Sequence, residues 1–159
     1  MNLAAAVIEP DDAVPIIHIR RDFAGTTEQL MRAHLDPEMF ARWIGPDGMN
    51  TRIDYWDART GGSWRYLATR GDDEFGFHGC FHQVADSRIV QTFTWEGTPD
   101  DVSLETLEFS AVTAGITRLH GRSLCESFEA RDAWLRSGME SGVNEGYAKL
   151  DGLLSHGAS

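Results

Sequence analysis

The sequence predicts an α+β fold, a curved antiparallel sheet of seven strands with helices near both ends of the chain. Six segments between residues 50 and 125 are rich in aromatic and β-branched residues, and turn residues separate them. Short connections between successive strands require antiparallel pairing, because parallel strands need a long crossover. Residues 137–154 instead carry apolar residues at helical spacing. We expect this last helix to lie across the concave face of the sheet.

Residues 1–14 have no periodic pattern, and we expect them to form a loose, dispensable N-terminal tail. A first strand is predicted at Ile16–Phe23. Residues 15–155 contain no linker, repeat or low-complexity segment, so we expect one domain there, followed by a short tail at 156–159. A chain of 159 residues is long enough to form a substantial core.

Two short helices are predicted after the first strand. Thr26 and Gln29 have the spacing of a capping box, which would start the first helix. Asp36 followed by Pro37 marks the start of the second, because the carboxylate caps free N–H groups and proline fits the first helical position. The Gly-Pro pair that begins at Gly45 would end this helix.

Six further strands and a short helix follow in the predicted order. Turn residues such as the Thr-Gly-Gly run at 60–62 set their limits. We expect the strands at 51–57, 63–69, 74–84, 88–96, 103–112 and 117–125, and a helical lead-in at 128–136.

The terminal helix has an apolar face interrupted by glycine. Ser137 with Glu140 predicts a capping box at its start. Gly142 and Gly146 lie on the edge of the apolar face, where each costs roughly 1 kcal/mol relative to alanine. Either the helix approaches another backbone closely there, or it leaves space beneath it. The apolar residues are Met139, Val143, Tyr147, Leu150, Leu153 and Leu154.

Charge and composition exclude several classes of partner. The net charge is 14 − 25 = −11, which disfavours nucleic acid and anionic membrane surfaces. No apolar run is long enough to span a bilayer, and the acidic start of the chain does not resemble a signal peptide. Cys80 and Cys125 are expected to be free thiols of a cytoplasmic protein. The oligomeric state is left open, with a homodimer among the alternatives.

Several segments resemble one family in the same order along the chain. The matching runs are FARWIGPDG, DARTGGSWRY, FHGCFHQVADSRIVQTFTWEG, TLEFSAVTAGITRL and GMESGVNEGYAKLDGLL. They resemble the activator-of-heat-shock-ATPase-like family of the SRPBCC superfamily, whose helix-grip fold is that of START domains and the birch pollen allergen. The resemblance extends from about Ile16 to Leu154.

The resemblance implies the element order β-α-α-β-β-β-β-β-β-α and a cavity between the sheet and the terminal helix. Superfamily members carry lipids, hold hormones or cyclise polyketides, and a eukaryotic relative stimulates a chaperone ATPase. This branch shares no catalytic motif, so the resemblance transfers no catalytic residue to this chain.

The candidate ligand-binding residues follow from strand alternation and helix periodicity together with this implied cavity. Large aromatic groups with a few polar groups are typical of small-molecule pockets, although an aromatic core would have the same composition. We predict that a small, largely apolar ligand contacts six residues: Trp64, Tyr66, Phe93, Met139, Gly142 and Val143.

Metal binding and acid–base chemistry have weaker support. Alternation places His78, Cys80 and His82 on one strand face, but residues two apart on a strand are separated by roughly 6.6 Å, so three would have to converge on one ion. We expect no metal and no cofactor. His78, His120 or Glu108 would serve as a general base only if directed into the cavity.

Two arginines could bind an acidic ligand, and the sequence can be searched for known catalytic motifs. Arg118 and Arg122 fit cross-strand pairing with carboxylates better than anchoring of an acidic ligand. No hydrolase, metalloprotease or nucleotide-binding motif occurs, which leaves open whether the protein is an enzyme.

Three functions remain. The first is binding of a small apolar molecule in the cavity. The second is a cyclase-like or dehydratase-like enzyme on the same cavity, which needs a titratable group inside it. The third is a chaperone-regulating interaction module, which a large exposed apolar patch would favour.

Overall fold

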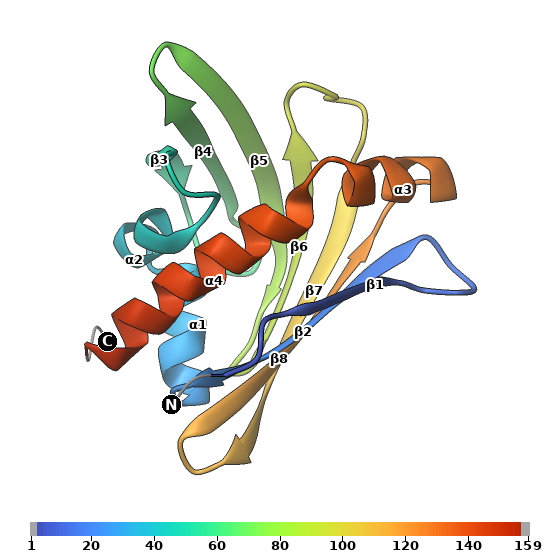
Figure 1. Cartoon of the computed structure of the whole chain (residues 1–159). Helices are drawn as coiled ribbons and strands as arrows, with labels where there is room; N and C mark the ends of the chain where they lie inside the picture. Colours follow the sequence, from blue (N-terminus) through green and yellow to red (C-terminus); the bar gives the residue numbers. More distant parts are fainter. Residues whose placement is uncertain (1–2, 157–159) are drawn as a thin grey trace.

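The computed structural model describes residues 3–156 and contains a single eight-stranded sheet with four helices (Figure 1). The strands are β1 (Val7–Pro10), β2 (Ile16–Ala24), β3 (Asn50–Trp56), β4 (Ser63–Arg70), β5 (Asp73–Val84), β6 (Arg88–Trp95), β7 (Ser103–Thr113) and β8 (Ile116–Leu124). The helices are α1 (Thr27–Leu35), α2 (Pro37–Trp43), α3 (Phe128–Arg136) and α4 (Met139–Ser155).

The sheet is antiparallel throughout, with strand order β1-β2-β8-β7-β6-β5-β4-β3. It is curved, and α4 crosses its concave side, while α2 lies beside β3 and α1 contacts β7 (Figure 1). The predicted α+β class, the two short helices after the first predicted strand and the long terminal helix are confirmed.

The eighth strand, β1, lies in the segment for which we predicted only a loose tail. It pairs with β2 from Val7 opposite Arg20 to Pro10 opposite Ile17. Because β1 is short and at the sheet edge, where proline is tolerated, it shows no periodic pattern. The Ala6 N–H also donates to Asn144 Oδ1 of α4 at 3.0 Å, so this segment contacts the terminal helix. The expected tails include residues 1–2 and 157–159, which lie outside the described residues.

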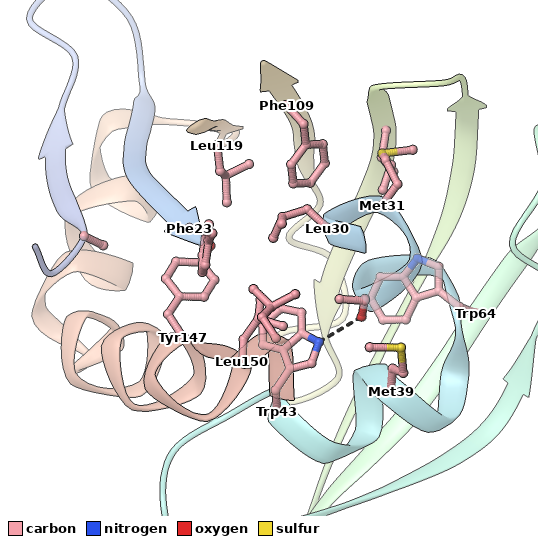
Figure 2. Packing of buried hydrophobic residues seen from close by; sticks show 14 of the residues in the cluster. Phe23, Leu30, Met31, Met39, Trp43, Trp64, Phe109, Leu119, Tyr147 and Leu150 are labelled. Carbon is pink, nitrogen blue, oxygen red and sulfur yellow. Dashed lines mark hydrogen bonds between the residues drawn. The ribbon is translucent and has the colours of Figure 1, made fainter. Parts of the chain in front are cut away.

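The starts of α1 and α2 form as their sequence signals predict. The Thr26 hydroxyl accepts from the Gln29 N–H, and the Gln29 side chain accepts from the Thr26 N–H, which completes the capping box. Asp36 Oδ1 accepts from the N–H groups of Glu38 and Met39. The two helices are joined further by the Trp43 indole, which donates to the Ala33 carbonyl at 2.8 Å (Figure 2).

The predicted start of the terminal helix is wrong by one residue, because the N-cap is Gly138 and not Ser137. Ser137 is the C-cap of α3, and its hydroxyl donates to the Trp134 carbonyl instead of capping α4. Gly138 separates the helices with φ of +88°, a left-handed conformation that glycine adopts without steric cost. This residue makes no side-chain cap, so α4 begins at Met139 without a capping box.

The core lies between α4, α1 and the sheet. Tyr147 and Leu150 of α4 pack beside Phe23 of β2 and Leu30 of α1 (Figure 2). The Phe23 and Tyr147 rings meet edge to face with centroids 5.1 Å apart. Burial of such side chains supplies about 25 cal/mol per Å² of apolar surface removed from water, which holds the helix on the sheet.

An ion pair reinforces the same contact. Arg21 of β2 is buried, and its two terminal nitrogens donate to the Asp151 carboxylate of α4 at 2.7 and 2.6 Å. Its guanidinium also lies 4.6 Å from the centroid of the Phe23 ring. This bidentate geometry fixes the rotation of α4 and therefore which of its residues face the sheet.

Candidate functional site

A cavity of about 320 Å³ lies between the concave face of the sheet and α4. Strands β2, β3, β4, β6, β7 and β8 contribute to its walls, and all four helices reach it. Most of its lining is apolar. Eight aromatic side chains surround the space: Phe40, Trp43, Trp56, Trp64, Tyr66, Phe93, Trp134 and Tyr147.

The structure brings the six predicted ligand-binding residues together around this cavity. Trp64, Tyr66 and Phe93 line it from the sheet, and Met139, Gly142 and Val143 line it from α4. Trp64 stacks on Tyr66, with centroids 5.6 Å apart and planes 18° apart. The two sheet residues Trp64 and Tyr66 are also core residues, only 2% and 6% exposed. The same aromatic side chains therefore belong to both the cavity wall and the hydrophobic core.

The space beside Gly142 is open enough for a side chain. A Cβ placed on this glycine would be 3.8 Å from the nearest Pro46 atom, an ordinary van der Waals distance. Since Gly142 lines the cavity, the missing side chain leaves room at the cavity wall.

A polar row crosses the apolar sheet face beneath the cavity. Strand pairing places Gln91 of β6 opposite Glu105 of β7, and Glu105 opposite Ser123 of β8. All three line the cavity. Gln91 Nε2 donates to Glu105 Oε1 at 2.9 Å, which is the only hydrogen bond of the Glu105 side chain to another described residue.

Burial in this apolar site raises the pKa of Glu105 above its usual value, and the hydrogen bond from Gln91 only partly opposes the rise. The pKa values of the Tyr66 and Tyr147 hydroxyls are also raised, first by burial and then by the negative charge of Glu105. Both tyrosines therefore stay neutral, and Glu105 is the acid of the cavity.

His34 of α1 also faces the cavity and is held in its neutral form. Its Nδ1 lies 2.7 Å from the Leu30 carbonyl oxygen, so Nδ1 carries the proton and donates. Burial lowers the pKa of His34 to about 4. The ring packs edge to face against Trp43 and Phe109, at 4.9 and 5.1 Å between centroids.

One further polar group at the cavity lacks a partner. Trp64 Nε1 is buried and has no hydrogen-bond acceptor among the described residues. An unsatisfied buried N–H is costly to the folded state.

The three candidate bases that we singled out are on the other side of the sheet. Alternation along β5, β7 and β8 directs Phe77, Leu107 and Leu119 inward, and therefore His78, Glu108 and His120 outward. His78 Nδ1 lies 2.8 Å from Glu96, and His120 Nε2 lies 3.0 Å from His18 Nδ1. A role for these three in the cavity is excluded by their direction.

The remaining polar candidates also lie on this outer face. Cys80 and His82 are exposed on the same side of β5 as His78. Arg118 pairs with Asp22 at 2.7 Å, and Arg122 pairs with Glu108 at 2.7 Å, which lowers the pKa of that carboxyl. The expected pairing of the two arginines with surface carboxylates is confirmed.

The sequence pattern of β7 indicates that Glu105 faces inward. Ser103, Glu105, Leu107 and Phe109 alternate along β7, so the two apolar members assign Glu105 to the buried face. A carboxylate on the buried side of a strand is unusual, and that contrast distinguishes it from Glu108, three residues later.

Comparison with known proteins agrees with this architecture. The model of the family described as activator of Hsp90 ATPase homolog 1-like protein matches residues 24–155. The chain belongs to this family. None of the curated proteins matches the sequence at a significant level.

Solved structures share the fold over nearly the whole chain. A protein from Rhodobacter sphaeroides is 28% identical, with a TM-score of 0.85 over 94% of this chain and 98% of that one. Protein Ms6760 from Mycobacterium smegmatis is 19% identical, with a TM-score of 0.84 over 96% and 97%. An HSP90 activator from Plasmodium falciparum is 17% identical, with a TM-score of 0.62 over 88% and 96%. Proteins of low sequence identity thus share this fold.

Among the described residues, no helix has the length and hydropathy that crossing a lipid bilayer requires.

Proposed function

We propose that this protein binds a small, largely apolar molecule in the cavity beneath α4. The observation that supports this most strongly is the cavity itself, about 320 Å³ in volume and lined by eight aromatic side chains. Pockets that bind small molecules begin near this size and combine apolar walls with a few polar groups. Gln91, Glu105 and Ser123 supply such polar groups here.

The proposed mechanism is sequestration. Transfer of apolar ligand surface from water to the cavity contributes about 25 cal/mol per Å², and one or two polar contacts fix the orientation. The residues proposed to contact the ligand are those predicted above from the sequence: Trp64, Tyr66, Phe93, Met139, Gly142 and Val143.

The enzyme alternative depends on a titratable group inside the cavity. His78, His120 and Glu108 do not meet this condition, because they lie on the outer face. Glu105 and His34 do meet it, but neither has a second acid or base at hydrogen-bond distance among the described residues. The observed geometry therefore supports a binding role better than a catalytic role.

A chaperone-regulating role is the other alternative, since one protein of similar fold is described as an HSP90 activator from Plasmodium falciparum. Such a role would need an exposed apolar surface for a partner. The large apolar side chains exposed in the described part of the chain are spread over β1, β3, β5, β7, β8, α3 and connecting loops. Among them, only Leu104 and Leu124 lie directly opposite each other on adjacent strands. This distribution does not favour that role over the cavity.

The test is titration with the neutral fluorescent probe N-phenyl-1-naphthylamine. We expect saturable binding at one site and at least about tenfold weaker binding by Gly142→Leu, whose side chain occupies cavity space. Leu104→Ala, on the outer face, is the control and should bind as the native protein does. Absence of binding, or equal binding by Gly142→Leu, would contradict the proposed function.

A further inference from the structure

We propose that the cavity selects an organic amine, an apolar molecule with one ammonium group, and that Glu105 is the counter-ion of this group. The inference rests on the proposed function and names the class of its ligand. It follows from the placement of charge in the cavity, the geometry around Glu105 and the aromatic walls.

The charged side chain at the cavity is negative, and no positive one in the described part of the chain balances it. Among the described residues that line it, Glu105 is the only acid, and neither lysine nor arginine is present. His34 is neutral, since its Nδ1 proton is donated to the Leu30 carbonyl and the ring is buried. Arg21, the only buried arginine or lysine in the described part of the chain, is bound by both terminal nitrogens to Asp151 and does not line the cavity.

An isolated carboxylate in such a place is costly, because Glu105 is half-buried in a mostly apolar wall with no oppositely charged group of the described residues beside it. Gln91 donates one hydrogen bond to Oε1 and holds the carboxyl group in position. A ligand ammonium would supply both the missing charge and the donors for the remaining lone pairs, and charge-assisted hydrogen bonds are the strong ones. An apolar ligand without an ammonium group would leave the Glu105 carboxylate without an opposite charge in the apolar cavity.

The aromatic rings around the cavity favour the same group. An ammonium over the face of a tryptophan or tyrosine is attracted by the ring quadrupole, most strongly where water is excluded. Trp64 and Phe93 line this wall with ring centroids 5.8 Å apart, whereas the Tyr66 ring is stacked against Trp64 and Phe77. Tyr147, like Glu105, lines the same cavity.

The same arrangement disfavours carboxylate ligands. A ligand carboxylate in this cavity would meet Glu105 without a cation to separate the two charges, and like charges at short range repel. The net charge of −11 also opposes the approach of anions. The selection is therefore for charge as well as for apolar surface.

Three probes of nearly equal size test the inference: 4-phenylbutylamine, 4-phenylbutan-1-ol and 4-phenylbutyrate. Calorimetric titration at pH 7.5 should show the amine binding at least about tenfold more tightly than the alcohol, and the butyrate at least about tenfold more weakly. Equal affinity of amine and alcohol, or preference for the butyrate, would overturn the inference while the alcohol still supported the proposed function. Failure of all three probes to bind would contradict the proposed function itself.

Two acid-to-amide variants of β7 localise the effect. In Glu105→Gln the advantage of the amine over the alcohol should fall to within about threefold, while the alcohol retains its affinity. Glu108→Gln, three residues along but on the outer face, is the matched control and should keep the full preference. An amine preference that persists in Glu105→Gln, or that disappears in Glu108→Gln, would overturn the assignment of Glu105 as counter-ion.

Discussion

Gly146 of α4 lies directly against the backbone carbonyl of Trp43, the last residue of α2. A Cβ placed on Gly146 would be 3.0 Å from that oxygen and 3.5 Å from the Gly45 nitrogen. The terminal helix can approach α2 this closely because no side chain intervenes. The two explanations for the glycines both hold, with close approach at Gly146 and open space at Gly142, one helical turn earlier.

Replacing each glycine with alanine should therefore have opposite effects. Gly146→Ala removes a helix penalty of roughly 1 kcal/mol but forces α4 away from a backbone atom, so we expect a net loss of about 1–3 kcal/mol. Gly142→Ala meets no close atom and should be neutral or gain up to about 1 kcal/mol. Urea denaturation of both variants measures the difference. Equal effects of the two substitutions would show that backbone approach does not explain Gly146.

The N-terminal segment should contribute to stability, contrary to the expectation from sequence. Deletion of residues 1–10 removes β1 and the hydrogen bond from Ala6 to Asn144, and we expect a loss of about 1–3 kcal/mol. Deletion of residues 1–5 leaves both interactions and is the control. Thermal melting of the two truncated proteins compares them, and identical curves would mean that β1 adds nothing to the free energy of folding.

His34 should make the protein sensitive to acid. The pKa of His34 is about 4 in the folded protein, whereas an unperturbed histidine, as in the unfolded chain, has a pKa of 6.5. The unfolded chain therefore binds the proton first as the pH falls. Stability is therefore full above pH 6.5 and is lost between pH 6.5 and pH 4, by roughly 3 kcal/mol. His34→Gln keeps a donor for the Leu30 carbonyl without this titration, and its stability should vary less over that window. Denaturant midpoints at several pH values provide the measurement, and an equal slope in the variant would refute the assignment.

Glu105 should give stability the opposite dependence on pH. Because burial raises its pKa above 4.5, the folded protein holds the proton more tightly than the unfolded chain does. Its contribution to stability is present below pH 4.5 and is lost as the pH rises. Glu105→Gln should accordingly stabilise the empty protein at pH 8 by roughly 1–3 kcal/mol and have little effect at pH 4. A variant that is less stable at pH 8 would show that the ionised carboxylate is satisfied in the native structure.

The fold could be predicted from the sequence because its signals are local. The capping residues Thr26 and Asp36 and the turn glycines 61 and 62 fix where elements begin and end, and alternation fixes the strands between them. β1 was missed because an edge strand of this length has no alternation to detect, and Gly138 was missed because a helix break depends on one dihedral angle.

The candidate site could be predicted only in part. The periodicity of α4 and of β4 and β6 indicated which residues face the cavity, once a cavity was implied by the resemblance. The direction of β5, β7 and β8 was not resolved, so His78, Glu108 and His120 were considered in place of Glu105. Cross-strand register brings Gln91, Glu105 and Ser123 into one row, and register depends on long-range pairing that no local pattern specifies.

The tryptophan side chains offer the most direct test of binding beneath α4. Of the five tryptophans in the sequence, Trp43, Trp56, Trp64 and Trp134 line the cavity, whereas Trp95 does not. We would record the indole N–H signals of ¹⁵N-labelled protein by NMR during titration with N-phenyl-1-naphthylamine. The account predicts saturable shifts of the four cavity tryptophans, with the Trp95 signal unchanged as an internal control. Shifts confined to Trp95, or no shift at all, would contradict ligand binding in this cavity.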